Sequence, residues 1–186
     1  MVTVGIDEVG RGCWAGPLVA GAVILSTPID GVKDSKKLTK FQRERLAEII
    51  FARAASFGLG WVWPGEIDEV GLSAAVRLAM QRAFAEIKGE YDAIVIDGNL
   101  NFLKDNPKSL CLIKADDSVP AVSAASIIAK VARDKYMSDI ATKYPEYAFE
   151  QHVGYGTNQH LQMLKLYGVT EIHRKSFRPI QALKNA

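Results

Sequence analysis

Two short apolar runs, each ending in an aspartate, constrain the fold of this chain most. The run VTVGI at 2–6 leads into Asp7, and the run YDAIVID at 91–97 ends on Asp97. Both runs are short, uninterrupted and rich in β-branched residues, which is typical of strands buried inside a sheet. Longer segments with helical spacing separate such runs along the chain. The order therefore predicts an α/β protein in which helices cover a central sheet.

The other expected elements follow from the same periodicities. Alternating or continuous apolar runs predict strands, and apolar residues three or four positions apart predict helices. These further strands are expected at 16–25, 57–63 and 109–116, and the helices at 38–54, 64–87, 120–144 and 156–168.

Residues that favour helix starts mark several of these boundaries. Thr39 is expected to cap the first helix, and Pro64 and Pro120 to open the second and third. The inner faces are expected to consist of Phe41, Leu46, Ile49 and Ile50 in the first helix and of Ile67, Val70, Ala74 and Leu78 in the second. No repeat or clear linker interrupts the pattern. We therefore expect a main domain over 1–145 and a helical region over 146–186 that is continuous with it.

Composition and charge place few limits on function. The chain of 186 residues is 48% hydrophobic, which suits a folded domain with a sizeable core. Its net charge of +2 is too small to indicate a nucleic-acid partner by itself. No apolar stretch approaches the roughly 18 residues that cross a bilayer, and no signal peptide precedes the first strand. Cys13 and Cys111 lack metal-ligand spacing, so we expect buried thiols in a cytoplasmic protein with no membrane partner.

Carboxylates follow three of the expected strands. Asp7 ends the first strand, Asp97 ends the run at 91–97, and Asp116 follows the apolar residues of CLIK. Each aspartate alone would more often form a turn or cap a helix. Together they would meet at one edge of the sheet, where the ligand sites of α/β proteins lie. Because clustered carboxylates repel each other, they favour hard divalent cations such as Mg²⁺, and hence a two-metal site for phosphodiester chemistry.

Five motifs in this order resemble one enzyme family. They are GIDEVGRG at 5–12, DSKKL at 34–38, IDGN at 96–99, KADDSVPAVSAASIIAKVARDKYM at 114–137 and GYGTNQHL at 154–161. Together they make the chain similar to ribonuclease HII, the type 2 ribonuclease H, from residue 4 to the IHRKSF segment at 172–177. The resemblance implies a ribonuclease H-like mixed sheet flanked by helices, with a small C-terminal helical appendage.

The resemblance also implies an activity. Members of that family are Mg²⁺- or Mn²⁺-dependent endonucleases that cut RNA/DNA hybrids and ribonucleotide-containing duplex DNA. They cut on the 5′ side of the ribonucleotide and leave a 3′-hydroxyl and a 5′-phosphate. We therefore expect these nucleic acids as substrates and a monomeric enzyme. Two alternatives are a nucleic-acid binding module with a degenerate acidic site and a DNA-directed nuclease on the same fold.

The family's catalytic carboxylates, which also hold its metal ions, fall on four residues of this chain: Asp7, Glu8, Asp97 and Asp116. Asp117 is the alternative to Asp116, because a shift of one residue in the match would exchange the two. Asp134 resembles a further acidic position that assists a second metal ion. Its alternative role is a charge on the helix surface that pairs with Arg133 or Lys135.

The resemblance also implies substrate-binding roles for Gly10, Arg11, Gly12, Lys36, Ser123 and Tyr155. The glycines would let the backbone approach a ribose and read its 2′-hydroxyl, although two glycines also suit a tight turn. Tyr155 would stack on a sugar or else anchor the packing of its loop. Lys36 would contact phosphate or belong to a solvated charge run. Ser123 would contact the substrate or permit close helix packing.

Some residues near these motifs have no place in the match. His152, His160 and His173 fall outside the catalytic quartet, and we assign them no catalytic role. Cys13-Trp14 replaces the Pro-Leu pair that commonly follows the family's Gly-Arg-Gly. The sister family, ribonuclease HIII, typically carries Gly-Thr-Gly there, so Arg11 favours ribonuclease HII.

Overall fold

A five-stranded mixed sheet lies at the centre of the computed structural model, which describes residues 1–32 and 38–184. Its strands, in the spatial order β3-β2-β1-β4-β5, are β1 (Thr3–Val9), β2 (Leu18–Leu25), β3 (Ala54–Val62), β4 (Ala93–Asp97) and β5 (Ser109–Leu112). β1 runs antiparallel to β2 and parallel to β4. β2 is also antiparallel to β3, and β4 is parallel to β5. This arrangement confirms the fold class predicted from the sequence.

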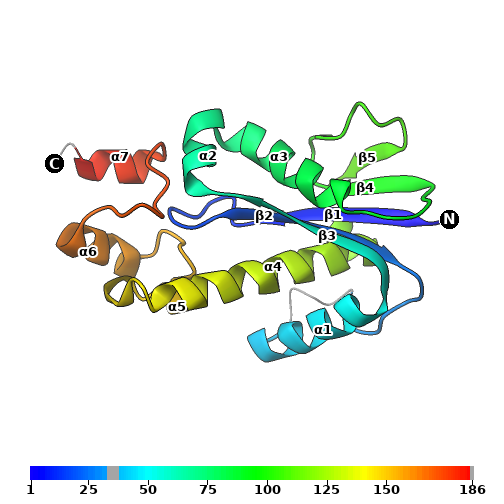
Figure 1. Ribbon diagram of the computed structural model, residues 1–186, viewed down its shortest axis with the longest axis horizontal. Helices are drawn as coiled ribbons and strands as arrows, with labels where there is room; N and C mark the ends of the chain where they lie inside the picture. Colours follow the sequence, from blue (N-terminus) through cyan, green and yellow to red (C-terminus); the bar gives the residue numbers. More distant parts are fainter. Residues whose placement is uncertain (33–37, 185–186) are drawn as a thin grey trace.

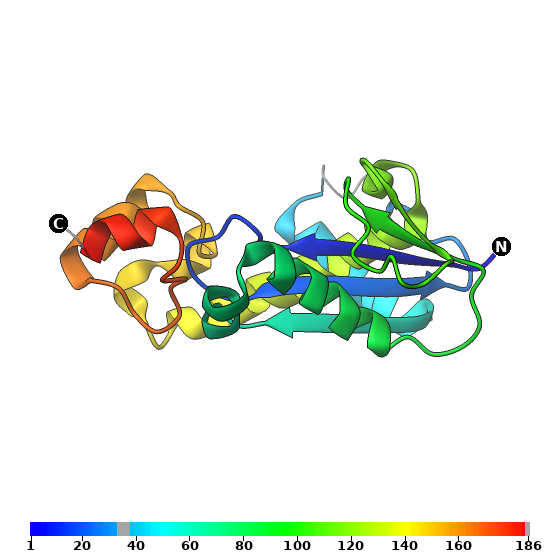
Figure 2. The same ribbon diagram turned by 90° about the horizontal axis from the view of Figure 1, so that it is seen from above.

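Helices cover both faces of the sheet (Figure 1). One face carries α2 (Pro64–Val70) and α3 (Leu72–Ala85), and the other carries α1 (Lys40–Arg53) and the long α4 (Pro120–Ala141). The described residues after these add η3 (Pro145–Tyr147), α5 (Phe149–His152), α6 (Asn158–Tyr167) and α7 (Arg178–Lys184). Figure 2 shows this helical region beyond one end of the sheet, beside the loop that leaves β1. Within the described part of the chain, no helix is long and apolar enough to cross a membrane.

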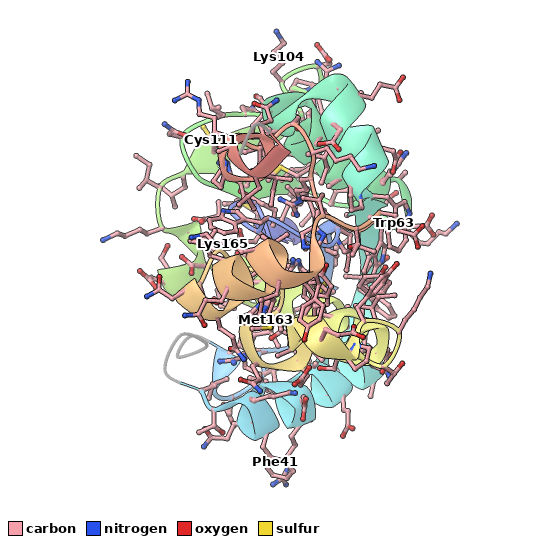
Figure 3. All side chains as sticks on the ribbon, turned by 90° about the vertical axis from the view of Figure 1, so that its left-hand side faces the viewer. Phe41, Trp63, Lys104, Cys111, Met163 and Lys165 are labelled. Atoms are coloured by element: carbon pink, nitrogen blue, oxygen red, sulfur yellow. The ribbon has the colours of Figure 1, made fainter. Side chains whose placement is uncertain are left out.

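α1 begins at the predicted cap and buries Leu46 and Ile50 of the predicted inner face, but not Phe41. The Thr39 hydroxyl accepts the Gln42 N–H at 3.3 Å, and the Gln42 side chain accepts the Thr39 N–H at 2.9 Å. Phe41 was expected inside, but it is 73% exposed and projects from the protein (Figure 3). Five residues turn a helix by about 500°, so Phe41 points about 140° away from Leu46. The buried face consists of Leu46, Ala47 and Ile50.

The prediction of a single helix over 64–87 is wrong, because the chain forms two helices there. Gly71 separates α2 from α3 and has a φ of +79°, which is outside the helical region. This break changes the phase of the buried stripe. Val70 is 44% exposed and Ala74 is exposed, contrary to the prediction. The residues that α3 buries are Ala75, Val76, Ala79, Met80 and Ala83.

The strand expected at 109–116 is shorter than predicted. β5 ends at Leu112, and Lys114 adopts a left-handed conformation with a φ of +58°. One 3₁₀ turn, η2 (Ala115–Asp117), then leads into α4. Asp116 therefore lies on this turn and not on a strand.

α4 lies in direct contact with the backbone of β1. A Cβ atom on Gly5 would lie only 2.1 Å from backbone atoms of Ala121 and Val122, so a residue with a side chain would push the helix away. The contact fixes the helix over the strand that carries Asp7 and Glu8. It is the feature of the fold that most directly positions the candidate site.

The C-terminal helices have a hydrophobic core that the main domain shares. This core contains Met137, Tyr147, Phe149, Leu164, Ile172 and Ile180. Ala15, from the loop after β1, belongs to it as well. Because Met137 lies on α4, the helical region is anchored both to the longest helix and to the loop next to the carboxylates.

Candidate active site

Asp7 and Asp97 lie at the same end of two neighbouring strands. Ile6 of β1 and Ile96 of β4 form the last pair between these parallel strands, so the next residues, Asp7 and Asp97, lie side by side. Asp7 does not end its strand as expected, because it still pairs with Gly21 of β2 and β1 continues to Val9. The Ala115 N–H donates to Asp97 Oδ1 at 2.7 Å and so fixes that carboxylate. The strand ends thus bring together two aspartates that are 90 positions apart in the sequence.

Asp7 is a buried acid, with 7% of the residue exposed. Its pKa is raised to about 8, mainly by burial and to a lesser extent by the charges of Glu8 and Asp97. Two hydrogen bonds act in the opposite direction: one from the Ser126 hydroxyl and one from the Glu8 N–H to Asp7 Oδ1 at 2.8 Å. Ser126 lies on α4, and its role as a partner of Asp7 was not predicted from the sequence.

Glu8 is also largely buried and has one nearby cation. Burial raises the pKa of Glu8, the Arg11 guanidinium lowers it, and Asp97 raises it. The Arg11 Nη1 atom lies 3.6 Å from Glu8 Oε1, and the arginine side chain is about half exposed. Arg11 of the Gly-Arg-Gly loop therefore partly balances the charge of the acidic pair.

Asp116 and Asp117 differ in their surroundings. Asp116 is 6% exposed, whereas Asp117 is exposed. Ser123 is fully buried, and its hydroxyl donates to the backbone carbonyl of Asp116. This bond ties η2 to the first turns of α4. The burial of Ser123 favours its alternative role in helix packing over direct contact with a substrate.

Asp134 pairs with a residue that the sequence did not indicate. Its carboxylate accepts from Lys130 Nζ at 2.8 Å, one turn earlier on α4. Neither predicted partner takes part, because Arg133 is fully buried and Lys135 pairs with Asp139. The expected pairing with Arg133 or Lys135 is thus wrong in its partner, and the role of Asp134 at a second metal ion stays a prediction. No interaction in the described residues links Asp134 to Asp7.

The donor set at the strand ends suits a hard divalent cation. Among residues 1–32 and 38–184, no three His, Cys, Asp or Glu side chains already stand in a metal-binding arrangement. The fit rests on chemistry: carboxylate oxygens are the preferred ligands of Mg²⁺. It rests also on charge, because a cation between Asp7, Glu8 and Asp97 would relieve the repulsion that raises the pKa of the first two.

Two buried arginines shape the loop that carries Gly10, Arg11 and Gly12. Arg174 Nη1 donates to the Arg11 carbonyl at 3.0 Å, and Arg174 Nε donates to the Gly16 carbonyl at 3.0 Å. Gly10 has a φ of +84°, and a Cβ there would lie 2.2 Å from Arg133 Nε. The sequence did not indicate that either arginine is buried, because each resembles a surface cation.

Arg133 joins this loop to the segment that carries Tyr155. Its guanidinium donates to the carbonyls of Pro17 at 2.8 Å, Ala15 at 3.1 Å and Val153 at 2.8 Å. Tyr155 is 39% exposed, and its ring centroid lies 5.9 Å from the Arg133 guanidinium carbon. Two sequence motifs some 140 positions apart therefore meet at one place. Lys36, the remaining substrate-binding prediction, lies outside the described residues.

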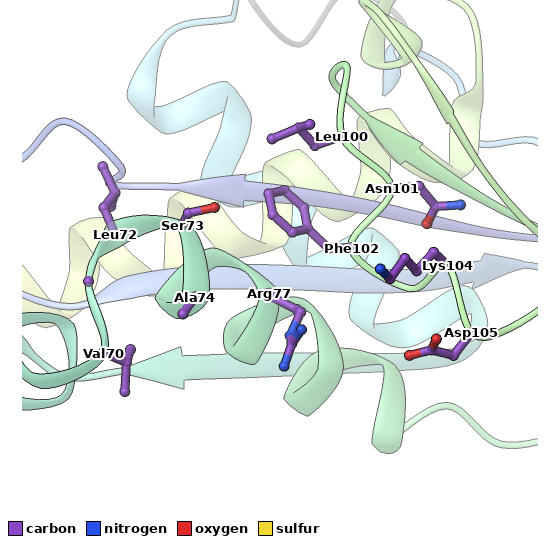
Figure 4. Close-up of a pocket in the computed structure, with 11 residues that line it drawn as sticks. Val70, Leu72, Ser73, Ala74, Arg77, Leu100, Asn101, Phe102, Lys104 and Asp105 are labelled. Carbon is purple, nitrogen blue, oxygen red and sulfur yellow. The ribbon is translucent and has the colours of Figure 1, made fainter.

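A cavity of about 700 Å³ lies elsewhere, between α3 and the loop after β4 (Figure 4). Arg77, Phe102 and Lys104 line it, and none of the predicted carboxylates does. The carboxylates lie instead towards the carboxyl ends of β1 and β4, outside this cavity.

The mixed sheet, its flanking helices and the carboxylates at its edge define a ribonuclease H-like hydrolase. The family model for ribonuclease HII matches residues 4–180, and the chain belongs to that family. A ribonuclease HII from Shewanella loihica is 45% identical over 95% of this chain and 87% of its own length. One from Nitrosococcus oceani is 46% identical over 98% of this chain and 91% of its own.

Solved structures agree with this assignment. The crystal structure of ribonuclease H2 from Pyrococcus horikoshii superposes with a TM-score of 0.86 at 28% identity, over 100% of this chain and 98% of that one. The protein is thus a ribonuclease H, and it belongs to a family of nucleic-acid hydrolases that depend on divalent metal ions.

Proposed function

We propose that the enzyme cuts the RNA strand of RNA/DNA hybrids and single ribonucleotides embedded in duplex DNA. The cut lies on the 5′ side of the ribonucleotide and leaves a 3′-hydroxyl and a 5′-phosphate. One observation carries the proposal: buried carboxylates and the glycine loop occupy the same end of β1. The carboxylates that would bind the metal and the backbone groups that would contact the sugar therefore lie within a few residues of each other.

Asp7, Glu8, Asp97 and Asp116 are the residues that would hold Mg²⁺ or Mn²⁺. When bound, such ions activate water and stabilise the oxygen that leaves the phosphate. The chain's own contribution is orientation. The Ser126 hydroxyl and the Glu8 N–H hold Asp7, and the Ala115 N–H holds Asp97. A carboxylate held in this way loses little freedom when it binds a cation.

Recognition of the ribose falls to the loop at 10–12 and to Tyr155. Backbone groups that approach the sugar closely can bond its 2′-hydroxyl, which is both a donor and an acceptor. The Tyr155 ring would stack on the following sugar, and its hydroxyl would join these contacts. A site built to bind a hydroxyl rejects a substrate that lacks it, because its own polar groups then remain unpaired.

The remaining predictions belong to the same proposal. Residues 1–145 would form the catalytic core and residues 146–186 would complete the substrate site, since Tyr155 and Arg174 both lie in the second part. Lys36 would contact a substrate phosphate. The enzyme would act as a monomer in the cytoplasm.

Three matched duplexes test the proposal. One contains a single ribonucleotide, one is a continuous RNA/DNA hybrid, and one is all DNA; each is incubated with Mg²⁺, with Mn²⁺ and with neither. We expect cleavage of the first two, at the 5′ phosphate of the ribonucleotide and only with metal. Binding without cleavage would support the nucleic-acid binding module instead. Cleavage of the all-DNA duplex would support a DNA-directed nuclease.

A further inference from the structure

The helical region contains three buried histidines that the cleavage site does not use. His160 and His173 are fully buried, and His152 is nearly so. The rings of His152 and His160 stack with their centroids 4.5 Å apart. Burying three imidazoles costs free energy unless their ring nitrogens form hydrogen bonds. The partners in these hydrogen bonds therefore show which segments of the chain the histidines connect.

Two of them form a directional chain of hydrogen bonds. The Thr170 N–H donates to His173 Nδ1 at 3.0 Å, so the proton of a neutral His173 is on Nε2. His173 Nε2 lies 3.0 Å from His160 Nε2, which must therefore accept. The proton of His160 is then on Nδ1, and it is donated to the Tyr155 carbonyl at 2.9 Å. One backbone N–H at Thr170 thus sets the tautomers of both rings.

The surroundings keep both rings neutral. Trp14 and Phe149 pack against His160, and Tyr147 and Phe149 pack against His173. Burial lowers the pKa of His160 to about 4 and that of His173 to about 3. A proton added to either ring would also place two N–H groups against each other along the chain of bonds.

The chain of bonds ends on the segment that carries Tyr155. Three successive carbonyls of this segment are held: that of Val153 by Arg133, that of Gly154 by the Trp14 N–H at 2.8 Å, and that of Tyr155 by His160. The Thr157 N–H also donates to the Tyr155 carbonyl at 2.9 Å. The backbone is thereby fixed while the tyrosine side chain remains accessible.

We propose that His160 and His173 are positioning residues that hold the Tyr155 backbone so that its ring stands ready at the ribonucleotide junction. The inference rests on the proposed function, in which Tyr155 reads that junction. The histidines act through Tyr155 and touch no substrate. Their effect should therefore appear in the choice between substrates and should need the tyrosine ring.

Two similar substitutions at position 160 distinguish the hydrogen bond that His160 makes to Tyr155 from the one that it makes to His173. His160→Asn can retain an N–H near Nδ1 for the Tyr155 carbonyl, whereas His160→Gln places its amide nearer Nε2 and loses that bond. We expect His160→Gln to lower kcat/KM on the single-ribonucleotide duplex roughly tenfold, and on the long hybrid much less. His160→Asn should stay within about threefold of the parent on both. Equal loss on both substrates, or equal behaviour of the two variants, would contradict the proposal.

A double-mutant cycle tests whether the effect passes through the tyrosine. In a Tyr155→Ala background, His160→Gln should change junction cleavage by less than about twofold. An undiminished effect would mean that His160 supports folding in general. If Tyr155→Ala alone cuts both substrates like the parent, the proposed reading of the junction is wrong and the histidines position nothing. If Tyr155→Ala is selective but His160→Gln is not, only the positioning role is wrong.

The tautomers give a readout that is independent of cleavage. Long-range ¹H–¹⁵N spectra of the intact protein at pH 7 should show His160 protonated at Nδ1 and His173 at Nε2. In His173→Gln, whose amide can still donate near Nε2, His160 should keep its tautomer. A protonated imidazolium, or the reverse tautomer at either ring, would overturn the proposal.

Discussion

The two sides of this active site are built on opposite electrostatic principles. On the carboxylate side, like charges are buried together, and the pKa of Asp7 is raised to about 8. The other side, which we call the reading side, consists of the loop at 10–12 and the segment that carries Tyr155. There the Arg133 guanidinium donates hydrogen bonds to three carbonyls, and His160 and His173 are neutral members of one chain of hydrogen bonds. The first side is under repulsion until a cation arrives, whereas the second is already ordered. Metal binding should therefore stabilise the carboxylate side most.

The largest effect should follow from removing an acid from the carboxylate side. We expect Asp7→Asn and Asp97→Asn each to lower cleavage at least about a hundredfold, because each loses a metal ligand. Asp7→Asn should leave the melting temperature at pH 8 equal to or above that of the parent, since it relieves repulsion. Thermal melts with and without Mg²⁺ would check this. Mg²⁺ should raise the melting temperature of the parent more than that of the variant.

Comparing Asp116→Asn with Asp117→Asn tests which of these two aspartates belongs to the carboxylate side. Because Asp116 is buried next to Ala115, whose N–H bonds to Asp97, and Asp117 is exposed, the first substitution should be the more damaging to cleavage. A larger loss in Asp117→Asn would mean that the match to the family is shifted by one residue.

A third prediction contrasts two glycines of the reading side. Gly10→Ala should lower the free energy of unfolding by about 2 kcal/mol, since its Cβ would meet Arg133 and its φ is positive. At Gly12 a Cβ meets no atom within 4 Å, so Gly12→Ala should change stability by less than about 0.5 kcal/mol. Urea unfolding measures both. If Gly12→Ala also leaves ribonucleotide cleavage intact, the backbone at Gly12 does not approach the sugar.

The neutral histidines predict a pH dependence of stability. Their pKa values in the folded protein, about 4 and about 3, lie below the ordinary value of 6.5, so below pH 6.5 the unfolded chain binds protons that the folded chain does not. Stability from this source is therefore complete above pH 6.5 and falls as the pH is lowered towards 4. The slope should approach about 1.4 kcal/mol per pH unit for each histidine.

The double variant His160→Gln with His173→Gln is the control for this slope. Urea unfolding at pH 7, 6 and 5 should show the difference in stability between parent and variant shrinking as the pH falls. Taking the difference removes the contribution of Asp7, whose raised pKa acts in the opposite direction. A difference that stays constant with pH would show that the histidines are not buried as neutral groups.

A smaller loss of cleavage than that of the aspartate variants should come from the tyrosine hydroxyl. Tyr155→Phe keeps the ring and loses one hydroxyl contact, so we expect a defect of about 1 kcal/mol, or about fivefold, on the single-ribonucleotide duplex. Tyr155→Ala should fall further, mostly on that substrate. Comparing both variants with the parent on the long hybrid shows whether Tyr155 reads the junction or only anchors its loop.

Much of the fold was predictable because it depends on local pattern. Every expected strand is present, and the Thr39 cap and the proline starts of α2 and α4 are correct. The errors arose where one residue changes the geometry. Gly71 resets the phase of a helix, and the left-handed Lys114 ends β5 early. Neither is visible as a break in hydrophobic periodicity.

The site was predictable as far as its chemistry follows the strand ends. Asp7 and Asp97 meet as expected, but the partners that hold them come from tertiary packing. Ser126 reaches Asp7 only because α4 touches the backbone of β1 at Gly5. Arg133 was expected at the surface, where most arginines lie, and only the fold reveals that it is buried.

The bond between Arg174 and the Arg11 carbonyl spans 163 positions and sets an order of events during synthesis. Chains grow at about 5–20 residues per second, so Arg174 leaves the ribosome on the order of ten seconds or more after the acidic pair. During that interval the emerging polypeptide has Asp7 and Glu8 but lacks the support for its glycine loop. If this loop reads the ribose as proposed, discrimination between ribose and deoxyribose is among the last properties that the newly made enzyme acquires.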